Sequence, residues 1–370
     1  MRPYESFHST FAAFRCPFRR DTVFTGGVDF HTPFPTRQMG LASRTILGAE
    51  RTLVASRSGT GLAVASSTGG ALVTETIEAN ANPSNIFVSV GTRGAGLVSY
   101  WNGTRYRFAL QVDPGTGNGG PSSNWRCGNV PLLPGATGLL PDKIVGQADA
   151  LLNAYFLVKA RTATGGASDG IYYMVRSASG TWTASPNVAP GTLAMQSPVA
   201  IEVISSTQIG FMTAGGGEAT VGKVTSGGIS VMFGNIPGVQ APNGDMEQTT
   251  GPGKFCASEN QSPLSGAPAG TADIRYVKRS PNTGVWLRYQ TVLATGEYAL
   301  HSCSIQVPAN GNPVVAYATK TGTVRLWRFG LFETVDATST YSKPILELTP
   351  ANKLLILYQG AGFLKFGCEQ

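Results

Sequence analysis

The feature that most constrains the fold is a phrase that occurs twice, in which a short strand pattern and a polar turn lead to a tryptophan. One copy runs from Ile171 to Trp182 and the other from Ile274 to Trp286. The two tryptophans are 104 residues apart, and a matching strand pattern ends 21 residues after each of them. Self-similarity at a fixed spacing indicates a repeated supersecondary unit. We therefore expect a chain built from repeated groups of short strands.

A shorter repeat near the C-terminal end sets the size of this unit. Val307 to Tyr317 spans ten residues, as Leu348 to Tyr358 does, and the two tyrosines are 41 residues apart. A unit of roughly 40 to 52 residues with about four short strands has the size of a propeller blade. We predict an all-β fold, a β-propeller of six or seven four-stranded blades. The alternative is a row of tandem β-sandwiches of about 100 residues each, although the 41-residue step favours the shorter unit.

A propeller must also close its ring, and this leads to a division of the chain. We predict that the strand patterns at 345–348 and 354–358 share a blade with a strand from the N-terminal part. Residues 1–45 are rich in Phe and Arg and do not alternate cleanly. We interpret them as an N-terminal arm that packs its aromatic rings on the body of the protein or on a neighbouring subunit, and residues 46–370 as the propeller domain.

Composition supports many strands and argues against nucleic acid as a partner. The 47 Gly and 23 Pro suit short strands and tight turns better than helices. Only 13% of the residues are charged, about half of the usual fraction, which is typical of virion, adhesin and secreted β proteins. The net charge of +7 is spread along the chain without a block of five like charges. We therefore do not expect nucleic-acid binding.

Three segments have a specific local interpretation. Residues 145–160 are the only candidate helix, and their apolar runs fit a buried strand equally well. Residues 113–137 and 237–270 are expected to be long loops, because they are rich in Gly, Pro and Ser. Asn102-Gly103, between two β-rich runs, is the strongest short signal for a hairpin in the chain.

The cysteines and the apolar runs limit the cell compartment only loosely. The five cysteines are widely spaced and form no C-x-x-C pair, which excludes a zinc ribbon or a thioredoxin motif. Cys256 with Cys303 and Cys16 with Cys368 are possible disulfides, and buried free thiols are an equal alternative. We expect no transmembrane helix and no secretory signal. The localisation stays open, with a virion or export by a non-Sec route as the expectation.

One of the two turns resembles a known structural motif. Ser280-Pro-Asn-Thr-Gly-Val-Trp286 is similar to the Asp-box turn of sialidase-like propellers, Ser-x-Asp-x-Gly-x-Thr-Trp, and residues 177–182 resemble it more weakly. Asn282 and Ser179 stand where that family has Asp, and the spacing to Trp is short in both copies. In the family the box is structural, since a side-chain acceptor caps the turn while Trp packs between strands. The resemblance therefore implies a propeller of the sialidase-like or lectin-like kind and structural roles for Trp182 and Trp286.

The sequence marks no catalytic or metal site. A sialidase-like site would need three converging arginines, a Tyr activated by Glu and an acidic proton donor, and no pair of carboxylates is distinguished by its spacing. Asp245 and Glu247 are the nearest candidates, with a solvated loop as the simpler role. We predict no metal and no cofactor. Three other patterns do not complete the motif they resemble. His8, His31 and His301 are too isolated to share a metal ion, and Asp113–Gly120 lacks the alternating acidic ligands of a calcium loop. Gly217–Lys223 resembles a phosphate loop, but Val224 follows it where Ser or Thr is required.

Surface recognition remains, and two clusters carry the appropriate chemistry. Sugars present C–H faces that stack on aromatic rings and hydroxyls that bond to Asn and Arg. The predicted ligand-binding residues are Tyr100, Trp101, Asn102 and Tyr106 at one hairpin, and Asn124, Trp125 and Arg126 in one loop. Ordinary packing is the alternative for each of them.

We therefore predict a recognition or structural module, without catalytic activity, that binds glycans or a cell-surface receptor. A phage or virus particle is the expected setting, with the module as a receptor-binding or tail-associated component and the N-terminal arm in contact with other subunits. One alternative is a sialidase-like glycoside hydrolase or a lyase on the same scaffold. The other is a purely architectural particle protein.

Overall fold

The structure is a computed structural model, and its described part consists of strands and the turns between them. The described residues are 19–24, 39–46, 49–67, 73–91, 94–112, 124–131, 136–139, 144–162, 170–184, 197–205, 208–215, 218–225, 228–233, 244–247, 254–260, 272–279, 286–291, 297, 299–328, 330–337, 344–349, 351–360 and 363–369. They contain 29 strands and no helix. No helix in these ranges is long and apolar enough to cross a membrane.

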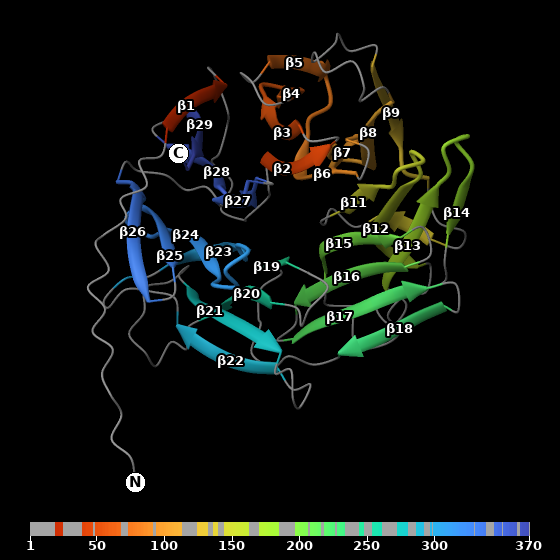
Figure 1. Cartoon of the computed structure of the whole chain (residues 1–370). Helices are drawn as coiled ribbons and strands as arrows, with labels where there is room; N and C mark the ends of the chain where they lie inside the picture. Colours follow the sequence, from red (N-terminus) through yellow and green to blue (C-terminus); the bar gives the residue numbers. More distant parts are fainter. Residues whose placement is uncertain are drawn as a thin grey trace, which may run out of the picture.

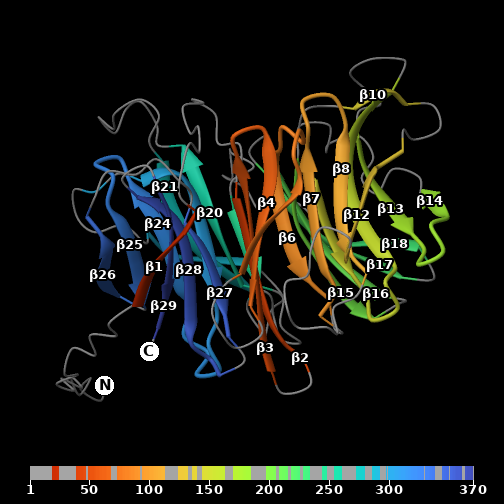
Figure 2. The same ribbon diagram turned by 90° about the horizontal axis from the view of Figure 1, so that it is seen from above.

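The strands form antiparallel sheets that follow one another around a ring (Figure 1). Seen from the side, the strands run between the two ends of this ring (Figure 2). The first two sheets are β2 (Met39–Ile46), β3 (Ala49–Ser58), β4 (Gly61–Ser67) and β5 (Val73–Glu78), then β6 (Ser84–Val90), β7 (Gly96–Trp101), β8 (Tyr106–Gln111) and β9 (Trp125–Asn129).

Two further sheets continue the ring. The third has the order β10 (Ala136–Leu139), β12 (Ala154–Thr162), β13 (Gly170–Arg176) and β14 (Trp182–Ala184), with β11 (Val145–Ala148) also paired to β12. The fourth contains β15 (Ser197–Ser205), β16 (Gln208–Gly215), β17 (Glu218–Thr225) and β18 (Gly228–Phe233).

The fifth sheet has eight strands and consists of two four-stranded meanders. They are β19 (Gly244–Glu247), β20 (Lys254–Asn260), β21 (Ala272–Arg279) and β22 (Trp286–Thr291), then β23 (Ala299–Gln306), β24 (Val314–Thr319), β25 (Val324–Arg328) and β26 (Leu331–Asp336). A single register pair, Ala272 with Ala299, joins the two meanders through β21 and β23. The predicted all-β propeller is confirmed, while the number of blades, six or seven, stays a prediction.

The last sheet joins the two ends of the chain. It has the order β1 (Arg19–Phe24), β29 (Phe363–Cys368), β28 (Leu354–Gly360) and β27 (Ile345–Leu348). β1 pairs antiparallel with β29, from Arg19 opposite Cys368 to Phe24 opposite Leu364. The predicted closure by a strand from the N-terminal part is thus confirmed. β1 and the start of β2 both precede residue 46, and the division into an arm and a propeller domain stays a prediction.

The hydrophobic core lies between neighbouring sheets and, within the eight-stranded fifth sheet, between its two meanders. One cluster joins Leu53 and Val64 of the first sheet to Val88 and Tyr100 of the second, and similar clusters bridge the second to the third, the third to the fourth and the last to the first. Full burial of such a side chain stabilises the fold by about 1.5–3 kcal/mol. Because each sheet supplies only half of a layer, the sheets depend on one another for stability.

The turn at residues 177–181 is capped by a side chain, but the acceptor is Ser177 and not Ser179, which stands where an Asp box has Asp. Ser177 Oγ accepts a hydrogen bond from the amide of Thr181 at 3.0 Å, and Gly180 has a φ of 99°. Trp182 follows and packs between sheets, against Phe108 of β8 and Phe156 of β12, with ring centroids 5.8 and 5.6 Å apart. In the other copy the turn lies outside the described residues, but Trp286 faces Arg279 across a hairpin just as Trp182 faces Arg176.

Three more turns use the same cap, and the sequence had not suggested them. In each, the amide of the fifth residue donates to the side chain of the first: Asn153 to Asp149, Thr323 to Thr319, and Lys353 to Thr349. The fourth residue has a positive φ in every case, 66° at Leu152, 86° at Gly322 and 63° at Asn352. The pattern of an Asp, Ser or Thr three residues before a Gly or Asn would have identified the turns at Thr319 and Thr349. It would have missed the turn at Asp149, because Leu152 takes the place of the Gly or Asn.

The structure decides one open interpretation and corrects two others. Of the helix and the buried strand left open for residues 145–160, it shows buried strands, β11 and β12. The expected loops at 113–137 and 237–270 contain β9, β10, β19 and β20. β9 and β19 are short, Gly-containing strands (WRCGN and GDME) without apolar alternation, so periodicity could not find them.

The cysteine pairing is also partly corrected. Cys303 is in a disulfide, whereas neither Cys127 nor Cys368 forms one. The predicted pair of Cys16 with Cys368 is therefore wrong. Cys16 lies outside the described residues, and so does the side chain of Cys256.

Candidate functional site

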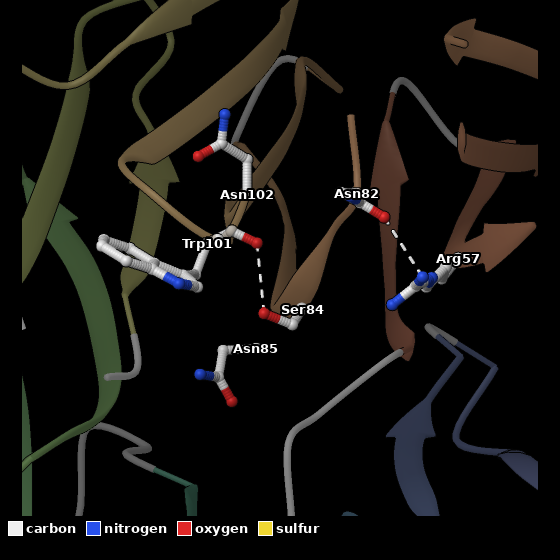
Figure 3. A pocket seen from close by; sticks show the side chains of 7 residues that line it. Arg57, Asn82, Ser84, Asn85, Trp101 and Asn102 are labelled. Carbon is white, nitrogen blue, oxygen red and sulfur yellow. Dashed lines mark hydrogen bonds between the residues drawn. The ribbon is translucent and has the colours of Figure 1, made fainter. Parts of the chain in front are cut away.

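A pocket of about 440 Å³ opens between the first and second sheets (Figure 3). Its lining residues are Arg57, Asn82, Ser84, Asn85, Trp101, Asn102 and Gly103. Among them are one cation, three amides and one hydroxyl, and none of them is acidic. Such a set can donate several hydrogen bonds to a polar ligand.

The pocket is assembled from segments that meet at one end of the ring. Arg57 lies near the end of β3, Asn82 lies in the connection from β5 to β6, and Ser84 begins β6. Trp101 ends β7, and Asn102 starts the turn into β8. In an antiparallel meander the end of the second strand and the start of the next sheet lie at the same end. The fold therefore brings together residues that are up to 46 positions apart in the sequence.

Two asparagines hold an unusual backbone conformation in this pocket. Asn82 has a φ of 45° and Asn85 a φ of 51°, two of the four positive values among the described residues other than glycine. Asn tolerates this left-handed region better than most residues. The conformation of Asn82 is held by a hydrogen bond from its backbone N–H to the Thr60 backbone carbonyl at 2.7 Å. Residues in this region cluster at ligand sites.

Arg57 is fixed by two hydrogen bonds. Its Nε donates to the Gly59 carbonyl at 2.8 Å. Its Nη2 donates to Asn82 Oδ1 at 3.1 Å, as Figure 3 shows. A guanidinium has five N–H donors, so three remain for a ligand after these two bonds. The described part of the chain contains no ion pair to Arg57. The charge is thus positioned at the pocket and is not neutralised there.

The hairpin turn orients the other polar groups. Asn102 Oδ1 accepts hydrogen bonds from the amides of Thr104 at 3.1 Å and Arg105 at 2.8 Å. Ser84 Oγ donates to the Trp101 carbonyl at 3.2 Å (Figure 3). The predicted Asn102-Gly103 hairpin is confirmed, with a four-residue turn between β7 and β8. The side-chain carbonyl of Asn102 is occupied by the turn, which leaves its Nδ2 to face a ligand.

The two predicted ligand-binding clusters do not converge. Trp101 pairs with Tyr106 at one end of the β7–β8 hairpin, whereas Trp125 of β9 pairs with Gln111 at the opposite end of β8. Trp101 and Asn102 line the pocket. Asn124, Trp125 and the exposed Arg126 lie at the other end of the second sheet, away from it.

Most of the predicted aromatic residues are packed in the core. Tyr100 and Tyr106 have no exposed surface, and Trp125 is 7% exposed with its Nε1 bonded to Glu75 Oε1 at 2.8 Å. Trp101 is also 7% exposed, and its ring meets Tyr106 edge to face with centroids 5.1 Å apart. In Figure 3 the indole of Trp101 points away from Arg57. No aromatic ring among them lies open as a stacking platform.

Tyr100 belongs to a clamp between the first and second sheets. Its hydroxyl donates to Glu78 Oε2 at 2.5 Å, and Arg107 reaches Glu78 Oε1 at 2.7 Å and the Tyr100 hydroxyl at 3.2 Å. Burial raises the pKa of Tyr100, and so does the bond to Glu78. A phenol held protonated is the opposite of the activated Tyr that a sialidase-like mechanism requires. The cluster is structural.

The same clamp of an acid, a tyrosine and a cation occurs twice more. Tyr317 and Arg325 both bond to Glu297, and Tyr358 and Lys365 both bond to Asp336. In all three copies the tyrosine lies directly opposite the cation in the strand register. Glu78 and Asp336 end the last strand of the preceding meander, whereas Glu297 lies in the connection just before β23. The acid precedes the tyrosine by 20–22 residues and the cation follows it by 7 or 8. That spacing is a repeat which the sequence analysis missed.

We expect each clamp hydroxyl to stabilise the fold. Tyr317→Phe and Tyr358→Phe should each lower the free energy of unfolding by about 1 kcal/mol, because each leaves a buried carboxylate with one partner fewer. Urea denaturation at pH 7 measures this. Tyr173→Phe is the matched control, since the Tyr173 hydroxyl has no hydrogen bond within the described residues. Equal losses in all three variants would contradict the clamp.

Known proteins resemble this chain only in fold. No family model matches the sequence, and no curated protein matches it significantly. A lectin from Burkholderia pseudomallei is 13% identical, with 89% of this chain and 97% of that chain covered and a TM-score of 0.56. The polysaccharide lyase Uly1 is 11% identical, with 90% of each chain covered and a TM-score of 0.51. The WD40 propeller domain of Doa1 is 12% identical, with 91% of this chain and 93% of that chain covered and a TM-score of 0.50.

Proposed function

We propose that this protein is a glycan-binding module and that the pocket at Arg57 is its binding site. The observation that carries the proposal is the convergence of a guanidinium, amides and a hydroxyl on one pocket with no acidic lining residue. Sugar hydroxyls are recognised by such donors and acceptors on a rigid scaffold. The structural likeness to a lectin adds support at the level of the fold.

The position of the pocket on the ring supports the same conclusion. It lies at the end where long connections leave the scaffold: 12 residues separate β14 from β15, and 11 separate β20 from β21. Most connections at the other end are short, such as the two residues between β15 and β16. Binding residues are concentrated on longer loops that a rigid scaffold positions.

The lining chemistry favours binding over hydrolysis. Glycoside hydrolysis uses two carboxyl groups on either side of the bond that is cleaved. None of the residues that line the pocket is Asp, Glu or His. Asp245 and Glu247 lie in β19, on another sheet. The lyase or hydrolase alternative therefore makes a distinct prediction, turnover of the bound glycan.

We expect Asn82→Gly to lower glycan affinity at least about tenfold. Glycine accepts the φ of 45° at this position, so the change removes the amide and the bond to Arg57 without backbone strain. A glycan array followed by calorimetry on the best ligand measures the effect. A tenfold loss of affinity corresponds to about 1.4 kcal/mol of binding free energy, which is the contribution of about one good hydrogen bond.

Asn352→Gly is the matched control for this experiment. It is the same chemical change at a φ of 63°, in the turn between β27 and β28 at the other end of the ring. If the Asn82→Gly variant bound the glycan with wild-type affinity, the proposal that this pocket is the binding site would be contradicted. Release of a shortened or unsaturated product from the bound glycan would favour the enzyme alternative.

We further propose that the module serves a phage or virus particle, with residues 1–45 in contact with other subunits. The low charge fraction of 13% supports a protein with large protein-facing surfaces. Mass spectrometry of purified particles tests this proposal: the protein should be a stoichiometric component. Capsid or tail genes beside its gene would support the same assignment, and a purely architectural role would be indicated by particle association without glycan binding.

A further inference from the structure

The chemistry of the pocket narrows the class of glycan, an inference that rests on the function proposed above. Different classes of sugar would bind to this set of groups with different affinities. The pocket has no open aromatic face, because Trp101 is 7% exposed and packs edge to face on Tyr106. A ligand held mainly by stacking would therefore find little surface. Without a stacking surface, the polar and charged lining groups are the contacts that distinguish one class of sugar from another.

Arg57 is the one charged residue in the lining. Its Nε and one hydrogen of Nη2 are used by Gly59 and Asn82, so both hydrogens of Nη1 and one of Nη2 remain. One N–H from Nη1 and one from Nη2 can bind the two oxygens of a carboxylate through parallel hydrogen bonds, a geometry that a neutral hydroxyl cannot provide. The two existing bonds hold the guanidinium in place before the ligand arrives, which reduces the entropy lost on binding.

The surroundings do not neutralise this charge. No acidic side chain lines the pocket. Glu78, the acid of the nearest clamp, already pairs with Arg107 at 2.7 Å and accepts the hydrogen bond of Tyr100. The side-chain hydrogen bonds of Arg57 are made to a carbonyl and an amide oxygen, which carry no net charge. An anionic ligand would therefore supply the missing counter-charge.

We propose that the pocket binds an acidic sugar, a uronic or sialic acid, with its carboxylate on the Nη1–Nη2 edge of Arg57. Asn82, Ser84 and Asn102 line the same pocket and supply amides and a hydroxyl for the ring hydroxyls of the sugar. A sulfate ester offers the same charge but not the planar, two-oxygen edge of a carboxylate. The carboxylate is therefore the expected anion, and sulfated sugars are a separate arm of the test.

The experiment compares matched acidic and neutral ligands on the full chain by calorimetry. The ligands are sialyllactose against lactose, trigalacturonic acid against its carboxyl-reduced form, and a sulfated galactoside. We expect at least one acidic member to bind about tenfold or more tightly than its neutral partner, with affinity falling as salt rises. Arg57→Gln should remove between about tenfold and a hundredfold of that affinity, leaving acidic and neutral ligands alike.

Lys353→Gln is the control, since it removes one positive charge from an exposed residue at the other end of the ring. Thermal melts of both variants confirm that they are folded. Equal binding of acidic and neutral ligands, or unchanged acidic preference in Arg57→Gln, would overturn the inference and leave the proposed function standing. Preference for the sulfated sugar alone would overturn it as well. No binding of any of these ligands by the wild type would overturn the inference, and no binding on the glycan array would overturn the proposed function as well.

Discussion

Deleting residues 1–24 is expected to abolish the cooperative folding of the protein. The deletion removes β1, which pairs with β29 and completes the last sheet. Without it, β29 presents an unpaired strand edge with Phe363, Leu364 and Phe366 in its sequence. Such an edge is a template for aggregation. The ring would also lose its one hydrogen-bonded connection between the N-terminal and C-terminal parts of the described chain.

Deleting residues 1–18 is the matched control. This variant lacks the segment before β1 but keeps Arg19–Phe24. We expect it to remain monomeric and to unfold within about 1 kcal/mol of the full chain, whereas the 1–24 deletion should be recovered as aggregate or should melt without a sharp transition. Size exclusion and calorimetry distinguish the two. If the variant without residues 1–24 unfolded in one cooperative thermal transition with the midpoint of the full chain, β1 would not be needed to close the ring.

The second large effect is expected at Asp149, which organises the turn between β11 and β12. Its carboxylate is 5% exposed and accepts four hydrogen bonds. Oδ1 accepts from the amides of Leu151 at 2.8 Å and Asn153 at 2.9 Å, and Oδ2 accepts from Asn153 Nδ2 at 2.9 Å and the Tyr155 hydroxyl at 2.8 Å. Every lone-pair direction of the carboxylate is therefore employed inside the protein.

We expect Asp149→Ala to lower the free energy of unfolding by about 3–5 kcal/mol. The change leaves several donors without their acceptor, each at a cost of about 1–3 kcal/mol where the group is buried. It also removes the bonds that hold Leu152 at a φ of 66°, a strained value for a leucine. Denaturant unfolding with two spectroscopic probes measures the loss.

Two comparison variants separate the carboxylate from the turn. Asp149→Asn keeps one side-chain oxygen for the two amides and should lose roughly half as much, about 1–2 kcal/mol. Thr349→Ala removes a similar cap that has one bond, from the Lys353 amide at 3.0 Å, and should cost about 1 kcal/mol. Equal stability of Asp149→Ala and Thr349→Ala would show that the additional bonds of Asp149 contribute little.

The candidate site illustrates which predictions sequence can support. Tyr100, Trp101, Asn102 and Tyr106 were predicted together as an aromatic and amide cluster at a hairpin, but only Trp101 and Asn102 line the pocket. The hairpin itself could be located because local turn chemistry determines where the chain bends. Tyr100, Tyr106 and Trp125 are buried in the core. Residue type does not reveal which side of a sheet a ring faces when both faces are covered.

Arg57, Asn82 and Asn85 had no local signal. Arg57 and Asn82 come from segments separated by 25 residues and are joined by one hydrogen bond. The clamp residues had a spacing signal that went unnoticed, since an acid, a tyrosine and a cation recur at similar separations three times. Its meaning depends on register, which places each tyrosine opposite its cation.

By itself the sequence determined the strand-rich fold, the repeated unit, the capped turn at Ser177 and the sharing of one sheet by both ends of the chain. The first three follow from local periodicity and turn chemistry, which depend on residues close together in the sequence. The last follows from the need of a propeller to close its ring. Only the tertiary structure decided which side chains face the core and which meet at the pocket. The physical reason is that both depend on how adjacent sheets pack, and packing brings together residues whose separation in the chain carries no local signal.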